Sequence, residues 1–210
     1  IDRRCLDDVN MILKAFGRSS KAKLVNFVYE SYPWYTIHSE DLSARRRKFK
    51  RAKPSIYSAG YEGLSVDGFL DNILVSGIRG IVDVRKNPIA RRYGFHKSTL
   101  SSICENLGID YIHEPGFGIE SEQRQDLETQ SDYSVSFKRY RRYTLGNAEE
   151  ELQSLSAKLK KKPHALMCME ANPACCHRSH LAEKLSEFSD LDICHLNWPR
   201  IETPLLAQKS

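Results

Sequence analysis

The sequence predicts a doubly wound α/β domain with a mostly parallel sheet of about five strands, preceded by a small helical segment. Two observations predict this fold. Short runs rich in β-branched residues alternate along the chain with stretches whose apolar residues recur at helical spacing. One strand–helix–strand unit also fits between residues 56 and 84, and a unit of this kind requires a parallel strand pair with a right-handed crossover.

Composition and charge agree with a globular protein that has one main domain. Of the 210 residues, 40% are hydrophobic and 28% are charged, as in soluble globular chains. No apolar run approaches the roughly 20 residues of a membrane span, and the amino terminus has no apolar signal-peptide core. The six cysteines are scattered, which favours reduced thiols and a cytoplasmic location. We expect a helical accessory segment at 1–42, a basic linker at 43–54 and the α/β domain at 55–210.

Helical spacing predicts the accessory segment, and charge predicts the linker. Apolar residues recur at helical spacing from Leu6 to Phe16, where Gly17 ends the pattern, and Ser20 is suited to cap a second short helix. A run of cations without acidic residues is typical either of a solvated linker or of a segment that contacts nucleic acid. The cations of this run are Arg45, Arg46, Arg47, Lys48, Lys50, Arg51 and Lys53.

The first half of the main domain alternates between strands and helices. Residues 56–59 form a short strand, and Ser65 caps a helix whose apolar residues show the 3.6-residue period. A β-branched strand follows at 78–84, then a helix at 98–107 and a third strand at 109–113. This alternation requires the parallel sheet.

The second half contains a long polar loop and then returns to regular elements. Residues 114–130 show no clear period, and loops of that length in compact domains are usually functional or disordered. A basic helix is predicted at 133–143, and Asn147 is suited to cap the next helix. Strands at 165–169 and 192–196 enclose a further helix, on which leucines recur at a spacing of four.

Chemically active side chains gather between the strand at 165–169 and the helix after it. Such loops are where open α/β sheets bind ligands, and the start of a helix favours anions. Cysteines that simply face the core are an alternative interpretation. Because Cys175 and Cys176 are adjacent, unlike the Cys-x-x-Cys of common zinc sites, we expect neither a metal nor a cofactor. The side chains gathered here are those of Cys168, Glu170, Cys175, Cys176, His177 and Arg178.

The strand at 78–84 also leads into a charged stretch. Asp83 and Arg85 lie at its carboxyl end, and Asn87, Arg91 and Phe95 follow. Cations alternating with aromatic rings suit a phosphate backbone with unstacked bases, although a surface loop with ion pairs has the same composition. The carboxyl ends of parallel strands meet at one edge of a sheet, so we expect one crevice to gather several of these groups. Those groups are Glu62, Asp83, Arg85, Glu170 and Arg178.

Several motifs occur in order between about residues 55 and 196, and in them the chain resembles the domain-of-unknown-function 488 family. The resemblance implies a soluble protein, and some members are associated with nucleic-acid modification or repair. After His113 the family has a Leu-Gly-rich turn, where this chain has residues 114–118, and the first fifty residues lie outside the resemblance. The motifs are Gly60-Tyr61-Glu62-Gly63, Asp83-Val84-Arg85, Asn87-Pro88, Gly94-Phe95, Tyr111-x-His113 and Cys168-x-Glu170 followed by Cys176-His177-Arg178.

The leading hypothesis is an enzyme that acts on nucleic acid, with DNA as the expected partner, and cleaves or exchanges a base at its glycosidic bond in repair, modification or defence. Such chemistry needs a carboxylate beside the sugar and a pocket that stacks a flipped base. The residues expected to do the chemistry are Glu62, Asp83, Cys168, Glu170, Cys176 and His177. The residues expected to bind the substrate are Tyr61, Arg85, Asn87, Arg91, Phe95, His113, Tyr140 and Arg178.

Two alternatives remain open at this point. The first is a thiolate phosphatase or sulfurtransferase with Cys168 or Cys176 as its nucleophile, activated by the helix start and by His177 and Arg178. It draws on a distant similarity to rhodanese and cysteine-phosphatase folds, which also place a cysteine in a loop before a helix. The second is a protein that binds nucleic acid without catalysis, which would show salt-dependent binding and no product.

Overall fold

The structure is a computed structural model in which the chain divides into two compact units, residues 1–48 with 200–210 and residues 49–199. The second unit contains residues 55–199 of the α/β domain that was predicted at 55–210. The residues that the structure describes are 10, 13–24, 51–90, 92–120 and 130–198.

The described part of the first unit contains two short helical turns. The first ends at Gly17, whose backbone N–H donates to the carbonyl of Leu13 at 2.7 Å. The hydroxyl of Ser20 accepts a hydrogen bond from the N–H of Lys23 at 3.3 Å, so Ser20 caps the second turn as expected. The rest of the accessory segment and the linker cations between 45 and 50 lie outside the described residues.

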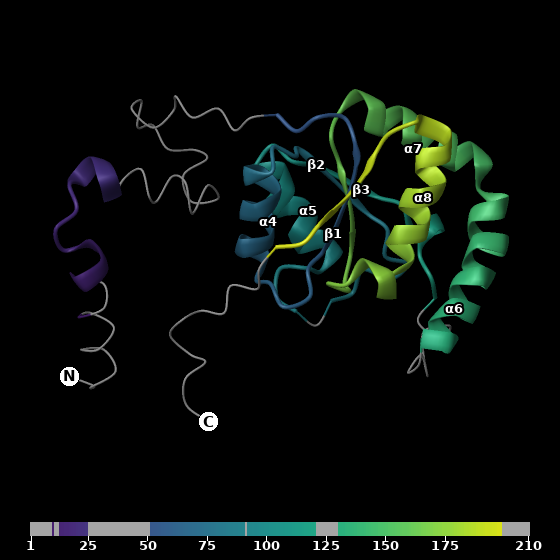
Figure 1. The fold of residues 1–210 in the computed structure, drawn as a ribbon, viewed down its shortest axis with the longest axis horizontal. Helices are drawn as coiled ribbons and strands as arrows, with labels where there is room; N and C mark the ends of the chain where they lie inside the picture. Colours follow the sequence, from purple (N-terminus) through teal and green to yellow (C-terminus); the bar gives the residue numbers. More distant parts are fainter. Residues whose placement is uncertain (1–9, 11–12, 25–50, 91, 121–129, 199–210) are drawn as a thin grey trace. The chain divides into compact units, whose positions relative to one another are not determined.

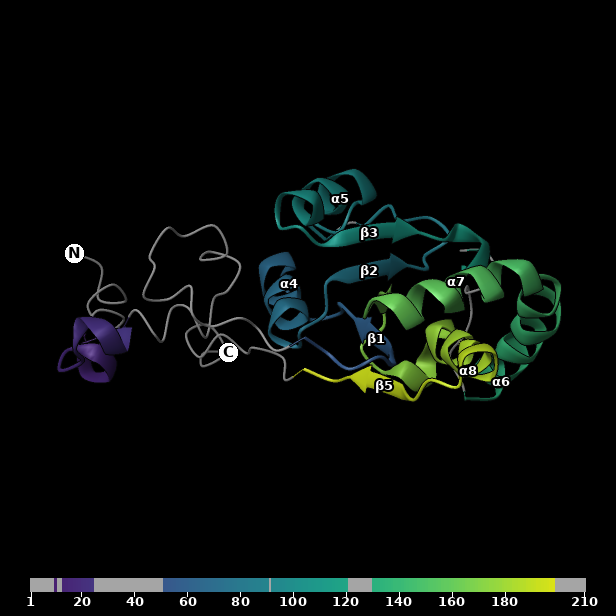
Figure 2. The ribbon, with the colours of Figure 1, turned by 90° about the horizontal axis from the view of Figure 1, so that it is seen from above.

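The second unit is built on a five-stranded sheet in which every described strand is parallel to its neighbours. The strand order is β3-β2-β4-β1-β5, so β4 is central and β3 and β5 form the two edges (Figure 2). The predicted α/β fold class is therefore confirmed. The strands are β1 Ile56–Gly60, β2 Gly80–Asp83, β3 Asp110–His113, β4 Ala165–Cys168 and β5 Ile193–Leu196.

Helices cover both faces of the sheet, with α4 and α5 on one side and α7 and α8 on the other (Figure 1). Among the described residues, no helix has the length and apolarity that crossing a membrane requires. The α-helices are α4 Val66–Val75, α5 Lys97–Asn106, α6 Gln130–Arg139, α7 Glu149–Lys161 and α8 His177–Ser189. Shorter helical turns are η1 Pro115–Phe117, the π-helical η3 Tyr140–Thr144, η4 Leu145–Asn147 and η5 Pro173–Cys175.

Apolar residues of the strands and the helices together form the core. Ile56, Val82 and Leu166 come from three different strands and form one buried cluster with Leu159 of α7 and Leu181 of α8. Successive strand residues point to opposite faces, so strands that are apolar throughout can support helices on both sides of the sheet. This double coverage explains why the strands read as short continuous apolar runs.

Helix α4 begins and ends where the sequence predicts. The hydroxyl of Ser65 accepts a hydrogen bond from the N–H of Gly68 at 3.3 Å. Phe69 and Ile73, one turn apart, are fully buried. Gly77 follows the helix with a φ of 78°, a left-handed conformation that favours glycine over residues with a side chain.

The segment between α6 and α7 differs from the prediction. Asn147 is not the cap of α7, because Ala148 occupies that position and the Asn147 side-chain amide donates to the carbonyl of Tyr143 at 3.0 Å. Helix α7 instead has glutamates in its first turn and lysines in its last, which suit the helix dipole. The basic helix predicted at 133–143 is a longer element, since α6 continues into the π-helical η3.

Candidate active site

A pocket of about 470 Å³ opens where the loops after β1 and β4 meet α6. The neighbouring strands β1 and β4 lead to helices on opposite faces of the sheet (Figure 1). Such a divergence leaves a crevice at the carboxyl ends of the strands. The pocket therefore lies where a doubly wound sheet normally binds its ligand. Its lining residues are Glu62, Ile119, Tyr133, Phe137, Met169, Glu170, Asn172, Cys175, Cys176 and His177.

The loop after β4 is held in place by its own residues and by the loop after β1. The side chain of Asn172 accepts a hydrogen bond from the N–H of Ala174 at 3.0 Å, which starts η5. The buried guanidinium of Arg178 donates to the carbonyls of Glu170 and Ala171. Across the crevice, a carboxylate oxygen of Glu62 accepts from the N–H of Ala171 at 2.9 Å. The backbone that carries Glu170 is thus fixed from both sides.

A cluster of two thiols, an imidazole and a carboxylate lies at the base of the pocket. The thiol of Cys168, the last residue of β4, donates to Oε2 of Glu170 at 3.1 Å. The Sγ atoms of Cys168 and Cys176 and a ring nitrogen of His177 all lie within 4.8 Å of one another. These three residues are buried, whereas Glu170 is partly exposed to the pocket.

The members of this cluster change one another's protonation. Burial raises the pKa of Glu170, and the charge of Cys176 raises it further. A hydrogen bond with Cys176, together with burial, raises the pKa of Cys168. Burial alone would raise the pKa of Cys176, but hydrogen bonds with Cys168 and His177 outweigh it and hold that pKa well below its ordinary value. Cys176 is therefore the thiol of the cluster that ionises most readily.

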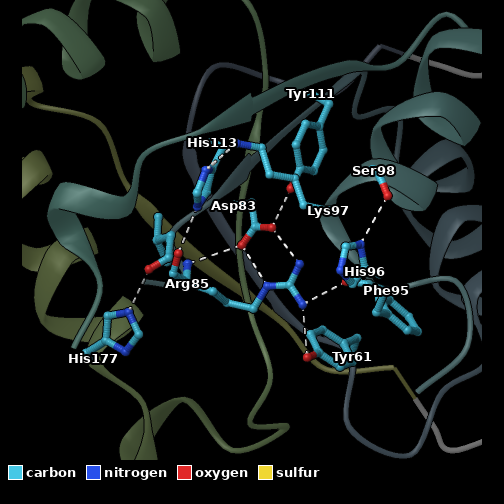
Figure 3. A network of polar contacts seen from close by, with 11 residues as sticks. Tyr61, Asp83, Arg85, Phe95, His96, Lys97, Ser98, Tyr111, His113 and His177 are labelled. Atoms are coloured by element: carbon cyan, nitrogen blue, oxygen red, sulfur yellow. Dashed lines mark hydrogen bonds and ion pairs between the residues drawn. The ribbon is translucent and has the colours of Figure 1, made fainter. Parts of the chain in front are cut away.

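A second polar network is centred on Asp83 and Arg85 (Figure 3). The Arg85 guanidinium donates to both carboxylate oxygens of Asp83, at 2.8 and 2.6 Å. It also donates to the hydroxyl of Tyr61 at 3.1 Å and to the carbonyl of Phe95 at 2.9 Å. The hydroxyl of Tyr111 donates to Asp83 at 2.5 Å. Every polar group at the centre of this network is therefore satisfied within the protein.

One backbone segment connects the network to the cluster. His113 contacts the carbonyl of Arg85 through Nε2 at 3.0 Å, which fixes the backbone just after β2. One residue earlier, the carbonyl of Val84 accepts a hydrogen bond from Nε2 of His177 at 3.1 Å, as the lower left of Figure 3 shows. The network thus sets the position of the group that orients His177.

The structure brings together some of the residues predicted to act chemically. Glu62, Glu170, Cys176 and His177 line one pocket, and Cys168 contacts Glu170 directly beneath it. Asp83, expected at the same crevice, is fully buried, does not line the pocket and pairs with Arg85. Of the five charged residues expected to converge on one crevice, the two glutamates line the pocket.

Most residues predicted to contact substrate are occupied inside the protein. Tyr61 and Phe95 stack on each other with ring centroids 4.1 Å apart, and both are buried. Arg178 is buried against its loop. The Tyr140 hydroxyl donates to the carbonyl of Phe117 at 2.8 Å. The remaining predictions are placed as follows: Arg85 and His113 belong to the second network, Asn87 is exposed, and Arg91 lies outside the described residues.

Several pocket residues were not predicted from the sequence. Tyr133 and Phe137 of α6 form an aromatic wall, with ring centroids 5.8 Å apart. Their spacing of four was visible, but a pair of rings at that spacing reads equally well as core. Ile119 and Met169 complete the apolar lining, and Met169 is an exposed residue beside the central strand.

Gly60, the last residue of β1, lies directly against the loop that carries Glu170. A Cβ atom on Gly60 would overlap the carbonyl group of Glu170, and backbone cannot swing away as a flexible side chain can. We expect Gly60→Ala to displace the loop and to lower the free energy of unfolding by about 1–3 kcal/mol in urea denaturation. Gly116→Ala is the matched control, since nothing lies within 4 Å of its Cβ position. Equal stability of the two variants would contradict the prediction.

Comparison with known proteins places the chain in a family. No curated protein and no solved structure gives a significant match. A family model described as domain of unknown function DUF488 matches residues 65–185, from the cap of α4 to the middle of α8. The match covers more than half of the chain and includes Asp83, Arg85 and the thiol cluster. The chain therefore belongs to the DUF488 family.

Proposed function

We propose that this protein is an enzyme that acts on nucleic acid and cleaves or exchanges a base at its glycosidic bond. One observation carries the proposal: Glu62 and Glu170, from the loops after two neighbouring strands, line the same open pocket. Breaking a glycosidic bond develops positive charge on the sugar, and carboxylates on either side of the bond stabilise that charge or activate the attacking water. Glu170 is the central residue of the proposal because it lies at the base of the pocket.

The pocket also suits a flat, partly apolar ligand. Its volume of about 470 Å³ falls in the range of small-molecule sites, which is about 300–1,000 Å³. Tyr133 and Phe137 provide the aromatic wall against which an extruded base stacks, in place of the buried pair Tyr61 and Phe95. Asn172, on the loop after β4, adds a polar side chain to the lining.

Cations border the pocket on the side of α6. Lys138 and Arg141 are exposed and line a groove that shares Phe137 with the pocket and passes over η5. A positively charged groove beside an aromatic pocket is the arrangement with which proteins follow a phosphate backbone while a base is held apart. This groove is the proposed path of the strand.

The proposed activity is tested with a panel of oligonucleotides, single-stranded and duplex, with unmodified and modified bases. The full chain is incubated with each, and released bases and strands are identified by mass spectrometry. We expect a free or exchanged base from at least one substrate, with the strand left abasic or carrying the new base. Tight binding without any released base across the panel would favour a non-catalytic binding protein.

The cations of α6 are tested by the salt dependence of DNA binding. Replacing both Lys138 and Arg141 with glutamine is expected to reduce the slope of log K against log salt by about two, because each phosphate contact contributes about 0.9. The matched control replaces Lys160 and Lys161. These exposed residues end α7, which leads into β4, so they lie near the amino end of that strand and away from the pocket. Equal changes of slope in the two double variants would rule out the α6 groove as the binding path.

A further inference from the structure

We propose that Cys168, Cys176 and His177 bind one divalent metal ion of the zinc type, with the ion's fourth position facing the pocket. Two thiolates and an imidazole are a ligand set that selects Zn²⁺ over Mg²⁺ or Ca²⁺. The two sulfurs and a ring nitrogen of His177 all lie within 4.8 Å of one another. In a tetrahedral site with bonds of about 2.0–2.3 Å, neighbouring ligand atoms are about 3.3–3.8 Å apart, so a small contraction closes the shell.

A hydrogen bond to the backbone already orients His177 in the way that metal-binding histidines are oriented. Its Nε2 contacts the backbone carbonyl of Val84 at 3.1 Å, and a carbonyl only accepts hydrogen bonds. A proton therefore occupies Nε2, and Nδ1 is the ring nitrogen that can bind the ion. Histidines that bind metals almost always donate their second N–H to such a group, which fixes the ring. Val84 in turn lies between Asp83 and Arg85, whose buried ion pair holds the backbone there.

The fold, rather than the sequence spacing, assembles this ligand set. Cys175 and Cys176 are adjacent and did not suggest a metal. Cys168 ends the central strand and Cys176 caps α8, and the loop between them returns the chain to the same place. Cys175 is partly exposed on the pocket wall and does not belong to the cluster.

An ion with these three ligands would border the pocket, because Cys176 and His177 line it together with Glu170. Three protein ligands plus one open position characterise catalytic zinc sites, whereas structural sites are closed by four. In this arrangement Glu170 is the neighbour that exchanges a proton with a water in the open position, and it is not a ligand. Only this use of the ion rests on the proposed function, since metal binding itself requires no substrate.

Metal content tests the proposal directly. The full chain is purified under reducing conditions without a metal-affinity resin, equilibrated with zinc, passed through a desalting column and analysed for bound metal. We expect about one zinc ion per chain, as in catalytic sites with three protein ligands. Cys168→Ser and Cys176→Ser are expected to lower zinc affinity by more than about 100-fold, since even loss of a group that only hydrogen-bonds a ligand costs about 10- to 100-fold. Cys194→Ser, an exposed control, and Glu170→Gln are expected to keep the ion.

A spectroscopic measurement covers the case in which the serine variants fail to fold. Cobalt bound to the native chain is expected to show thiolate-to-metal charge transfer in the near ultraviolet. Absence of this band, or zinc retained by both folded serine variants, would overturn the proposal. Zinc bound at this stoichiometry without release of any base would leave the metal site standing and remove the proposed function. Undiminished base release by zinc-free protein would leave the proposed function standing and show that the ion has no role in the reaction.

Discussion

Glu170→Gln is expected to abolish most base release while the protein stays folded. The substitution preserves size and keeps an oxygen that accepts the hydrogen bond from the Cys168 thiol, so it removes only the charge and the exchangeable proton. Positioned acid–base groups contribute about 10²- to 10⁴-fold to turnover, and we expect kcat to fall within that range. The measurement is single-turnover base release on the oligonucleotide identified with the panel.

The control for this variant is Glu105→Gln. Glu105 is exposed on α5, and that helix covers the face of the sheet opposite α8 (Figure 1). The substitution makes the same chemical change there and should leave turnover at the native rate. Base release by Glu170→Gln at the native rate, with an unchanged circular dichroism spectrum, would remove Glu170 from the mechanism. The pocket carboxylate of Glu62 would then be the next group to test.

The fold was predictable because its signals are local. A β-branched run such as 78–84, the cap at Ser65 and the stop at Gly77 each act within a few residues. The alternation of strands and helices then requires a parallel sheet. Asn147 misled for the same reason: its own sequence context suits a cap, but its amide is bonded to the carbonyl of Tyr143 in the preceding turn.

The two pocket glutamates were predictable from topology alone. Glu62 and Glu170 follow two strands whose carboxyl ends were expected at the same edge of a doubly wound sheet. The loops after such strands meet at that edge. The partners of the other charged and aromatic residues were not predictable in this way. Tyr111 lies 28 residues from Asp83 along the chain and contacts it only because β3 pairs with β2. Asp83 lies only two residues from Arg85, but the sequence does not show whether Arg85 pairs with it or with a phosphate.

The pairing of the two thiols was likewise not predictable from the sequence. Cys168 and Cys176 looked like independent candidates for a nucleophile, since eight positions separate them in a loop with a proline break. The structure makes them a pair with a shared imidazole, and this changes the chemistry that they support. A metal ligand set of this kind is visible only after the loop has been folded back onto the central strand.

Among single substitutions in the Asp83–Arg85 network, Asp83→Asn is expected to cause the largest loss of stability. The Asp83–Arg85 pair is buried, with side-chain exposures of 0% and 5%. Removing one partner of a buried pair leaves an uncompensated charge, at a cost of about 3–5 kcal/mol. The asparagine also changes the acceptor for the Tyr111 hydroxyl. Urea denaturation is expected to show a loss of that size in the free energy of unfolding.

A double variant separates the charge from the packing. Asp83→Asn combined with Arg85→Met removes both charges, so its loss of stability should be smaller than the sum of the two single losses. Glu187→Gln, which breaks the exposed pair with Lys184, serves as the surface control and should change stability by less than about 1 kcal/mol. If Asp83→Asn unfolds at the same urea concentration as Glu187→Gln, the network does not hold the end of β2. The carbonyl of Val84, which accepts from His177, would then be held in place by contacts other than this ion pair.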